Sequence, residues 1–254
     1  MLGYEAYIYI ASPRNLNNTN SSWHTPVAND LSKDKLTSSI IIYPEIVVGN
    51  PLNGKYVIRY LLNRENQFSQ GFIKKNISEY TLTYDKIYGE SDSTLYVPNI
   101  DLTIFNEIDS LPFQNRSITL TYDGKGSNYS TIGIVEGSLP ITRTQPESKY
   151  ELAALFKKTM YLFTLDSNTA LIQEAIMCGA IPVLMQLKPN TIESLENSVY
   201  GISGYALSMD EFEIYRAIHT QKIAQNMIRT KILSFKKELL FFIDEVNYYF
   251  NNLK

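Results

Sequence analysis

Residues 161 to 185 decide the fold, and they read YLFTLDSNTALIQEAIMCGAIPVLM. A short apolar run leads into the polar triplet Asp166-Ser167-Asn168, after which apolar residues recur at helical spacing. Polar side chains of this kind cap the starts of helices, and Gly179 stands where a helix commonly ends. Residues 181–185 are apolar again and have the length of a buried strand. The stretch therefore predicts a strand, a helix and a second strand, with the two strands parallel and the crossover right-handed.

Glu174 lies in the middle of this predicted helix, among apolar residues. In α/β proteins ligands bind at the carboxyl ends of the strands, where the N-termini of helices attract phosphate groups. A carboxylate at this depth can accept hydrogen bonds from the hydroxyls of a ribose. We therefore predict a nucleotide site made by Glu174 with Asp166, Ser167, Asn168 and Thr169. A solvated glutamate on an outer helix face is the alternative, because most charged side chains are exposed.

A longer pattern in the same stretch is carried by Asp166, Thr169, Leu171, Glu174, Ala175, Cys178, Gly179, Pro182 and Val183. It resembles the donor-nucleotide half of GT-B glycosyltransferases, the retaining type with a glutamate near the ribose. Residues 139–143, 151–155 and 43–63 are similar to the same family, above all to a bacterial branch that builds surface polysaccharides such as capsule and lipopolysaccharide. The resemblance implies an α/β fold with two Rossmann-like domains, of which the second binds most of a nucleotide sugar.

A second cluster of candidate residues follows the predicted strand at 117–122 and reads Asp123-Gly124-Lys125-Gly126. Glycine lets the backbone approach an anion, and lysine supplies a point charge for phosphate, although the same four residues also suit a hairpin turn. The resemblance implies that a cation here neutralises the diphosphate leaving group. We therefore assign Gly124, Lys125 and Gly126 to the donor site and a catalytic role to Lys125. Arg143 is a second candidate cation, with an ordinary surface arginine as the alternative.

The first half of the chain holds a predicted strand at 39–43 and a loop at 44–51. Loops at the carboxyl ends of strands build binding sites, so Glu45 is predicted to be an acceptor-side polar group or base, with a plain loop charge as the alternative. The apolar spacing over 53–63 predicts an amphipathic helix whose Lys55 and Arg59 face outward. Residues 80–84 and 94–97 read as further strands.

The expected domains are residues 1–112, an acceptor-side Rossmann-like domain, and residues 113–254, a domain that binds the nucleotide sugar. A helix from residue 209 onward is expected to pack back on the first domain. Residues 2–10 resemble the second strand of a GT-B domain. Either the true start of the domain lies upstream, or the N-terminal domain is shortened and lacks its first strand and glycine loop.

Composition and net charge indicate which classes of binding partner and which cell compartment to expect. The net charge of −3 gives no electrostatic reason to expect nucleic acid. The single cysteine excludes an internal disulfide framework and favours the cytoplasm. No apolar run reaches the length of a membrane span. Location at the inner face of the membrane, peripheral membrane association and the oligomeric state stay open. No metal and no cofactor are expected beyond a UDP- or GDP-linked donor substrate.

The sequence therefore predicts transfer of a sugar from a nucleotide sugar to a glycan or lipid-linked acceptor. Lys125, with Arg143 and Thr169, is expected to stabilise the charge on the departing diphosphate, while Glu174 positions the donor. A GT-B-like nucleotide-binding or scaffold protein without turnover is the main alternative, which the shortened first domain favours. A dinucleotide-dependent enzyme is disfavoured, because no G-x-G-x-x-G follows a predicted strand.

Overall fold

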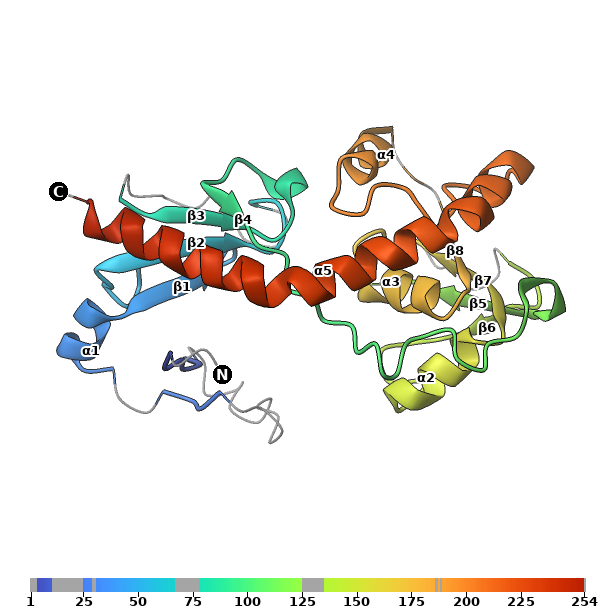
Figure 1. Cartoon of the computed structure of the whole chain (residues 1–254), viewed down its shortest axis with the longest axis horizontal. Coiled ribbons are helices and arrows are strands. Elements are labelled where there is room, and N and C mark those ends of the chain that lie inside the picture. Colours follow the sequence, from blue (N-terminus) through green and yellow to red (C-terminus); the bar gives the residue numbers. More distant parts are fainter. Residues whose placement is uncertain are drawn as a thin grey trace.

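The chain is an α/β protein with two parallel sheets, one built from each half of the sequence (Figure 1). A computed structural model describes residues 4–10, 25–28, 31–66, 78–124, 135–185, 187 and 189–253. One long helix, α5 (Glu211–Asn251), runs along both sheets. Within this part of the chain no helix has the length and apolarity needed to cross a membrane.

The first sheet contains four parallel strands in chain order, β1 (Ile40–Pro44), β2 (Tyr56–Leu61), β3 (Tyr80–Thr83) and β4 (Ser93–Thr94). A short helix, α1 (Lys33–Ser38), precedes it, and a 3₁₀ turn, η2 (Lys86–Tyr88), lies between β3 and β4. Every residue of β3 is buried, as expected for a parallel strand that is covered on both faces. Nearer the N-terminus, Ile8 forms a single parallel bridge with Val27.

The helix predicted over residues 53–63 is wrong, because the segment forms strand β2. Val57, Ile58 and Leu61 are all buried in the sheet, so the strand shows no alternation between an inner and an outer face. A short apolar run of this kind has no periodicity that separates a strand from a buried helix. The outward orientation predicted for Arg59 is also wrong, since this side chain is fully buried.

The second sheet contains β5 (Ile118–Tyr122), β6 (Leu139–Pro140), β7 (Thr159–Thr164) and β8 (Ile181–Leu184), all parallel and in the order β6-β5-β7-β8. Three helices accompany it, α2 (Lys149–Phe156), α3 (Ala170–Met177) and α4 (Pro189–Glu196). A 3₁₀ turn, η3 (Phe113–Asn115), precedes β5. The predicted unit at 161–185 is confirmed as β7-α3-β8, with Gly179 just beyond α3 at a φ of +83°.

The largest hydrophobic cluster lies around the second sheet and includes Phe156, Leu162 and Met177. Phe105 belongs to the same cluster, so packing with the second half begins before residue 112. Cys178 is fully buried there, and burial raises the pKa of its thiol to about 12. The thiol is therefore a small apolar core group, as its place on the apolar helix face predicts.

Helix α5 joins the two halves, because different parts of it pack on different sheets. In its first half, Ala224 and Ile228 belong to the cluster around the second sheet. Near its end, Val246 and Phe250 pack with residues of the first sheet such as Tyr80. Figure 1 shows the helix crossing the middle of the view, from beside β8 to the strands of the first sheet. The two strand systems therefore share one helix as a common support.

Candidate functional site

A pocket of about 260 Å³ lies between the two halves, where strands of both sheets end. From the first half, Leu62 follows β2, while Tyr84 and Asp85 follow β3. From the second half, residues 167–170 follow β7 and begin α3, and the opposite wall comes from residues 195–205. The pocket thus lies at the carboxyl edges of two parallel sheets, the place where α/β proteins bind ligands.

The turn between β7 and α3 is held by its own side chains. The Thr164 hydroxyl accepts a hydrogen bond from the Asp166 backbone N–H at 3.0 Å, and Asp166 Oδ1 accepts one from the Asn168 N–H at 3.0 Å. Thr169 is the N-cap of α3, and its hydroxyl faces the N–H of Leu171 at 3.4 Å. The N-cap therefore lies one residue after the predicted triplet, and the positive end of the helix dipole lies beside the pocket.

The structure brings Gly124 and Asp166 together, although they lie on different strand ends. Gly124 has a φ of +82°, and a Cβ added to it would lie 2.3 Å from the Cβ of Asp166. Only a glycine allows the ends of β5 and β7 to approach so closely. Lys125 and Gly126, the other members of this predicted phosphate loop, lie outside the described residues.

Glu174 is buried, with 4% of its surface exposed, so the alternative of a solvated glutamate is wrong. Its Oε1 lies 3.4 Å from Nζ of Lys149, at the start of α2, and Glu174 is not among the residues that line the pocket. Burial raises the pKa of the Glu174 carboxyl, and the positive charge of Lys149 opposes that rise. Among the described residues Lys149 is the one partner of this buried carboxylate, at a long distance. Such burial destabilises the fold and is common where a group has a function.

Replacing Glu174 with glutamine is expected to stabilise the fold at pH 7. Because burial raises the pKa above the ordinary glutamate value of 4.5, the folded chain binds the proton more tightly than the unfolded chain. The ionised carboxylate therefore costs stability above the raised pKa, and the cost vanishes below pH 4.5. Lys149 is left without a partner but is more than half exposed to water.

Urea denaturation of wild type and Glu174→Gln at pH 7 and pH 4 measures this difference, with the exposed Glu147→Gln as control. The free energy of unfolding of Glu174→Gln should exceed that of the wild type at pH 7, and the gap should shrink at pH 4. A variant less stable than the wild type at pH 7 would show that the contact with Lys149 outweighs the cost of burial.

Glu45 and Arg143 lie outside the lining of the pocket. Glu45 is buried, and its Oε2 accepts a hydrogen bond from the backbone N–H of Leu62 at 3.0 Å, which ties the ends of β1 and β2 together. Burial raises the pKa of Tyr88, a residue of the pocket wall, and the negative charges of Asp85 and Glu45 add to that rise. Arg143 is exposed and follows the edge strand β6. The acceptor-side role of Glu45 and the donor-side role of Arg143 stay predictions.

A group of tyrosines that sequence reasoning missed forms much of the pocket wall, and its members are Tyr84, Tyr88, Tyr96, Tyr200 and Tyr205. The ring centroids of Tyr84 and Tyr96 are 4.7 Å apart, and those of Tyr96 and Tyr200 are 5.4 Å apart. Burial raises the pKa of Tyr88 to about 12, so its hydroxyl is neutral at physiological pH. Rings with a neutral hydroxyl suit the faces and hydroxyls of sugars and bases.

Asp85 fastens the two halves of the wall to each other. Its Oδ1 accepts a hydrogen bond from the N–H of Ile87 at 3.2 Å and caps η2. Its Oδ2 accepts one from the N–H of Val199 at 3.0 Å, in the second half of the chain. No short-range pattern marks such a contact, because the two residues are far apart in the sequence.

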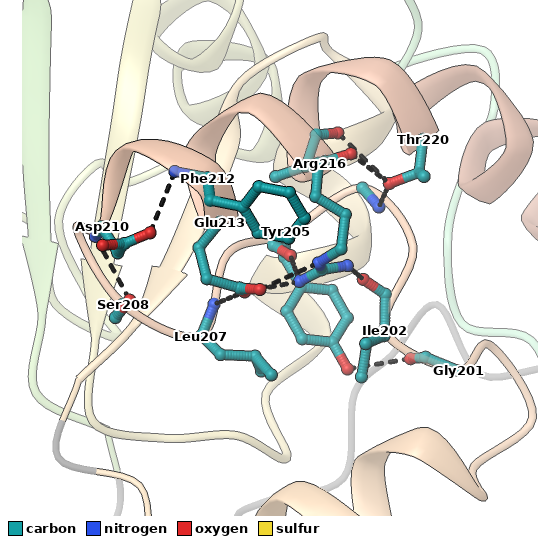
Figure 2. A network of polar contacts seen from close by, with 12 residues as sticks. Gly201, Ile202, Tyr205, Leu207, Ser208, Asp210, Phe212, Glu213, Arg216 and Thr220 are labelled. Carbon is teal, nitrogen blue, oxygen red and sulfur yellow. Dashed lines mark hydrogen bonds and ion pairs between the residues drawn. The ribbon is translucent and has the colours of Figure 1, made fainter.

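The wall segment around Tyr205 is fixed to α5 by a polar network, which Figure 2 shows. The Arg216 guanidinium donates to the carbonyls of Ile202 at 2.5 Å and Tyr205 at 3.1 Å. It also forms an ion pair with Glu213 at 2.7 Å, which lowers the pKa of that carboxyl. The Tyr205 hydroxyl donates to the carbonyl of Gly201 at 2.8 Å. Helix α5 therefore positions this side of the pocket.

Metal-ligating side chains do not cluster in the part of the chain that the structure describes. The polar groups of the pocket are hydroxyls, amides, the start of a helix and the carboxylate of Asp85, both oxygens of which accept hydrogen bonds from backbone N–H groups. They suit hydrogen bonds to a polar organic ligand and the binding of an anion.

Comparisons of the chain with protein-family models, with curated proteins and with solved structures gave no match.

Proposed function

We propose that this protein is a glycosyltransferase of the GT-B type, which moves a sugar from a UDP- or GDP-linked donor to a glycan or lipid-linked acceptor. One observation carries the proposal: strands of two parallel sheets end at the same pocket, and both halves of the chain line it. A transferase needs two substrates at one place, and each sheet edge can hold one of them.

The donor belongs to the second half in this proposal. Its diphosphate lies at the N-terminus of α3, where the helix dipole favours negative charge. Ser167 and Thr169 add hydroxyls from the pocket lining, and Lys125 adds the charge that stabilises the leaving diphosphate. Glu174 accepts hydrogen bonds from the ribose hydroxyls in this proposal. Because Glu174 does not line the pocket, the ribose must approach its carboxylate from the side of α3 that faces the pocket.

The acceptor belongs to the first half in this proposal. Tyr84 and Tyr88 offer ring faces and neutral hydroxyls to a sugar, next to the ends of β2 and β3. Glu45 lies one hydrogen bond behind this wall, on the backbone of Leu62. Leu62 itself lines the pocket, so this hydrogen bond is the contact that joins the proposed base to the wall.

A GT-B-like protein that binds a nucleotide without turnover is the second candidate. The pocket volume of about 260 Å³ lies below the roughly 300–1,000 Å³ that is usual for small-molecule sites. The Glu45 carboxylate accepts a hydrogen bond from a backbone N–H and does not line the pocket. The proposed base at the end of β1 therefore does not reach the pocket. Both observations favour binding of a nucleotide over reaction with a second substrate.

Calorimetric titration with UDP, GDP, CMP and NAD tests the donor site, using wild type, Glu174→Gln and the control Glu147→Gln. We expect a nucleoside diphosphate to bind the wild type and the control equally. Binding to Glu174→Gln should be about 10- to 100-fold weaker, because glutamine offers one neutral acceptor oxygen in place of a charged carboxylate with two. Equal affinity for all three proteins, or no binding of any diphosphate, would refute the assignment.

A second measurement separates the two candidates once a diphosphate has been found. The matching nucleotide sugars are incubated with the protein, and release of the nucleoside diphosphate is followed with and without glycan acceptors. Release that depends on the protein and falls in Glu174→Gln supports a transferase. Tight binding without release supports the nucleotide-binding protein.

A further inference from the structure

One face of helix α5 is uncovered along its whole length. The opposite face packs on both sheets, whereas several large apolar side chains point to solvent, namely Phe212, Tyr215, Ile223, Leu233, Leu240, Phe241 and Tyr248. Figure 1 shows α5 extending across the view from the second sheet to the first. Apolar residues gathered on one exposed helix face commonly mark an interaction site.

The C-terminal half of this face has an ordered pattern, which we name the 233–248 face. Its members are Leu233, Lys237, Leu240, Phe241, Asp244 and Tyr248, all exposed and separated by steps that keep them on one side of a helix. From the N-terminal to the C-terminal end, these side chains are apolar, basic, apolar, apolar, acidic and apolar. In the reverse direction the apolar positions are the same, and the basic and acidic positions are exchanged.

The two charged members of the 233–248 face lack partners within the described chain. No hydrogen bond or ion pair there involves Lys237 or Asp244. They lie two helical turns apart on the same side, too far for a direct contact with each other. Each is therefore available to a charge on another molecule.

We propose that the 233–248 face binds a second copy of this chain, with the two α5 helices antiparallel and the two-fold axis between residues 240 and 241. In that arrangement Lys237 lies opposite Asp244 of the second copy, and the symmetry repeats this ion pair. Leu240 and Phe241 flank the axis, and Leu233 lies beside Tyr248 of the second copy. The contact is isologous, which is how a closed two-fold dimer forms.

The positions of the two charges favour a second copy of this chain as the partner, with the two α5 helices antiparallel. In a parallel pair Lys237 would oppose Lys237, and Asp244 would oppose Asp244, which is unfavourable for partly buried charges. Only the antiparallel pair matches both charges and both apolar ends at once. The six residues include none that line the pocket, so the dimer leaves the pocket open.

The expected dimer is weak, because six side chains per copy bury less than about 1,200 Å², the range of transient complexes. Sedimentation velocity from about 1 to about 300 µM should show a sedimentation coefficient that rises with concentration. Phe241→Ser should raise the dimer Kd at least about tenfold, since each dimer loses two apolar side chains.

Phe212→Ser is the matched control. The two phenylalanines have nearly the same exposure, 72% for Phe212 and 71% for Phe241, on the same helix. Phe212 lies outside the 233–248 face, so its replacement should leave the dimer Kd unchanged. Both variants remove exposed side chains and are expected to keep the wild-type thermal midpoint.

Charge exchange gives the sharpest test. Lys237→Asp alone and Asp244→Lys alone each place like charges together twice per dimer, so each should raise the Kd about tenfold or more. The double variant should restore the wild-type Kd. A mixture of the two single variants should form a heterodimer more tightly than either variant pairs with itself.

Three results would overturn the proposal. One is a monomer at every concentration, and another is a dimer whose Kd does not respond to the charge exchanges. The third is binding of the monomer to phosphatidylglycerol vesicles that Phe241→Ser abolishes, which would assign the face to a lipid surface.

Discussion

Replacing Arg59 with methionine is expected to lower the free energy of unfolding by about 3–5 kcal/mol, the cost of leaving a buried charge without its partner. Arg59 is fully buried in β2, and its Nε lies 2.7 Å from Oε2 of Glu79. Its guanidinium also donates to the carbonyl of Val47 at 2.9 Å and to that of Gly49. It lies over the ring of Tyr43 as well, with 4.9 Å to the centroid.

Methionine fills much of the same space but donates no hydrogen bond. It would leave the Glu79 carboxylate, whose side chain is only 6% exposed, and two backbone carbonyls unsatisfied. The loop after β1, which Arg59 holds against the sheet, would lose its anchor. Since this loop carries Glu45 at its start, the damage should reach the edge of the pocket.

Urea denaturation followed by circular dichroism measures this loss, with Arg143→Met as control. Arg143 is exposed, so its replacement should change the free energy of unfolding by no more than about 0.5 kcal/mol. Adding Glu79→Gln to Arg59→Met should recover part of the loss, because the uncompensated charge is then removed. A loss below about 1 kcal/mol in Arg59→Met would contradict the burial of this ion pair.

Gly124→Ala is expected to have the second largest effect, a loss of about 2–4 kcal/mol together with weaker nucleotide binding. An alanine at a φ of +82° is strained by about 1–2 kcal/mol. The added Cβ would also lie 2.3 Å from the Cβ of Asp166, an atom too close to the backbone to swing away. The ends of β5 and β7 must therefore separate, which displaces the turn that leads into α3.

Gly137→Ala is the control that separates the backbone strain at positive φ from the steric clash with Asp166. Gly137 has a similar φ of +75°, but a Cβ there would meet no atom within 4 Å. This variant should lose only the strain and should bind a nucleoside diphosphate like the wild type. If thermal melting and calorimetry gave the same values for both variants, the close approach of Gly124 to Asp166 would have no energetic consequence.

Part of the candidate site was predictable because its signals are local. The turn at 166–169 and the end of α3 at Gly179 follow from capping side chains and a left-handed glycine. These signals need only neighbours within one helical turn. The N-cap in the structure is Thr169 and not a member of the predicted triplet. A difference of one residue is expected where several adjacent polar residues could each cap the helix.

The rest of the site depends on contacts between distant segments. Asp85 and Val199, like Glu174 and Lys149, are far apart in the sequence and are brought together by the tertiary fold. The tyrosines of the wall come from positions between 84 and 205, and the chain contains 19 tyrosines in all, so composition singles out none of them. Residue type alone therefore could not show which of them face the pocket.

The sequence by itself determined the β7-α3-β8 unit, the burial of Cys178 and the α/β class of the chain, because strand length, helical spacing and caps are local properties. Only the tertiary structure decided that residues 56–61 form a strand and that Arg59 lies inside it. Burial on both faces of a parallel sheet removes the alternation that marks a strand, and a buried arginine is recognisable only beside its carboxylate.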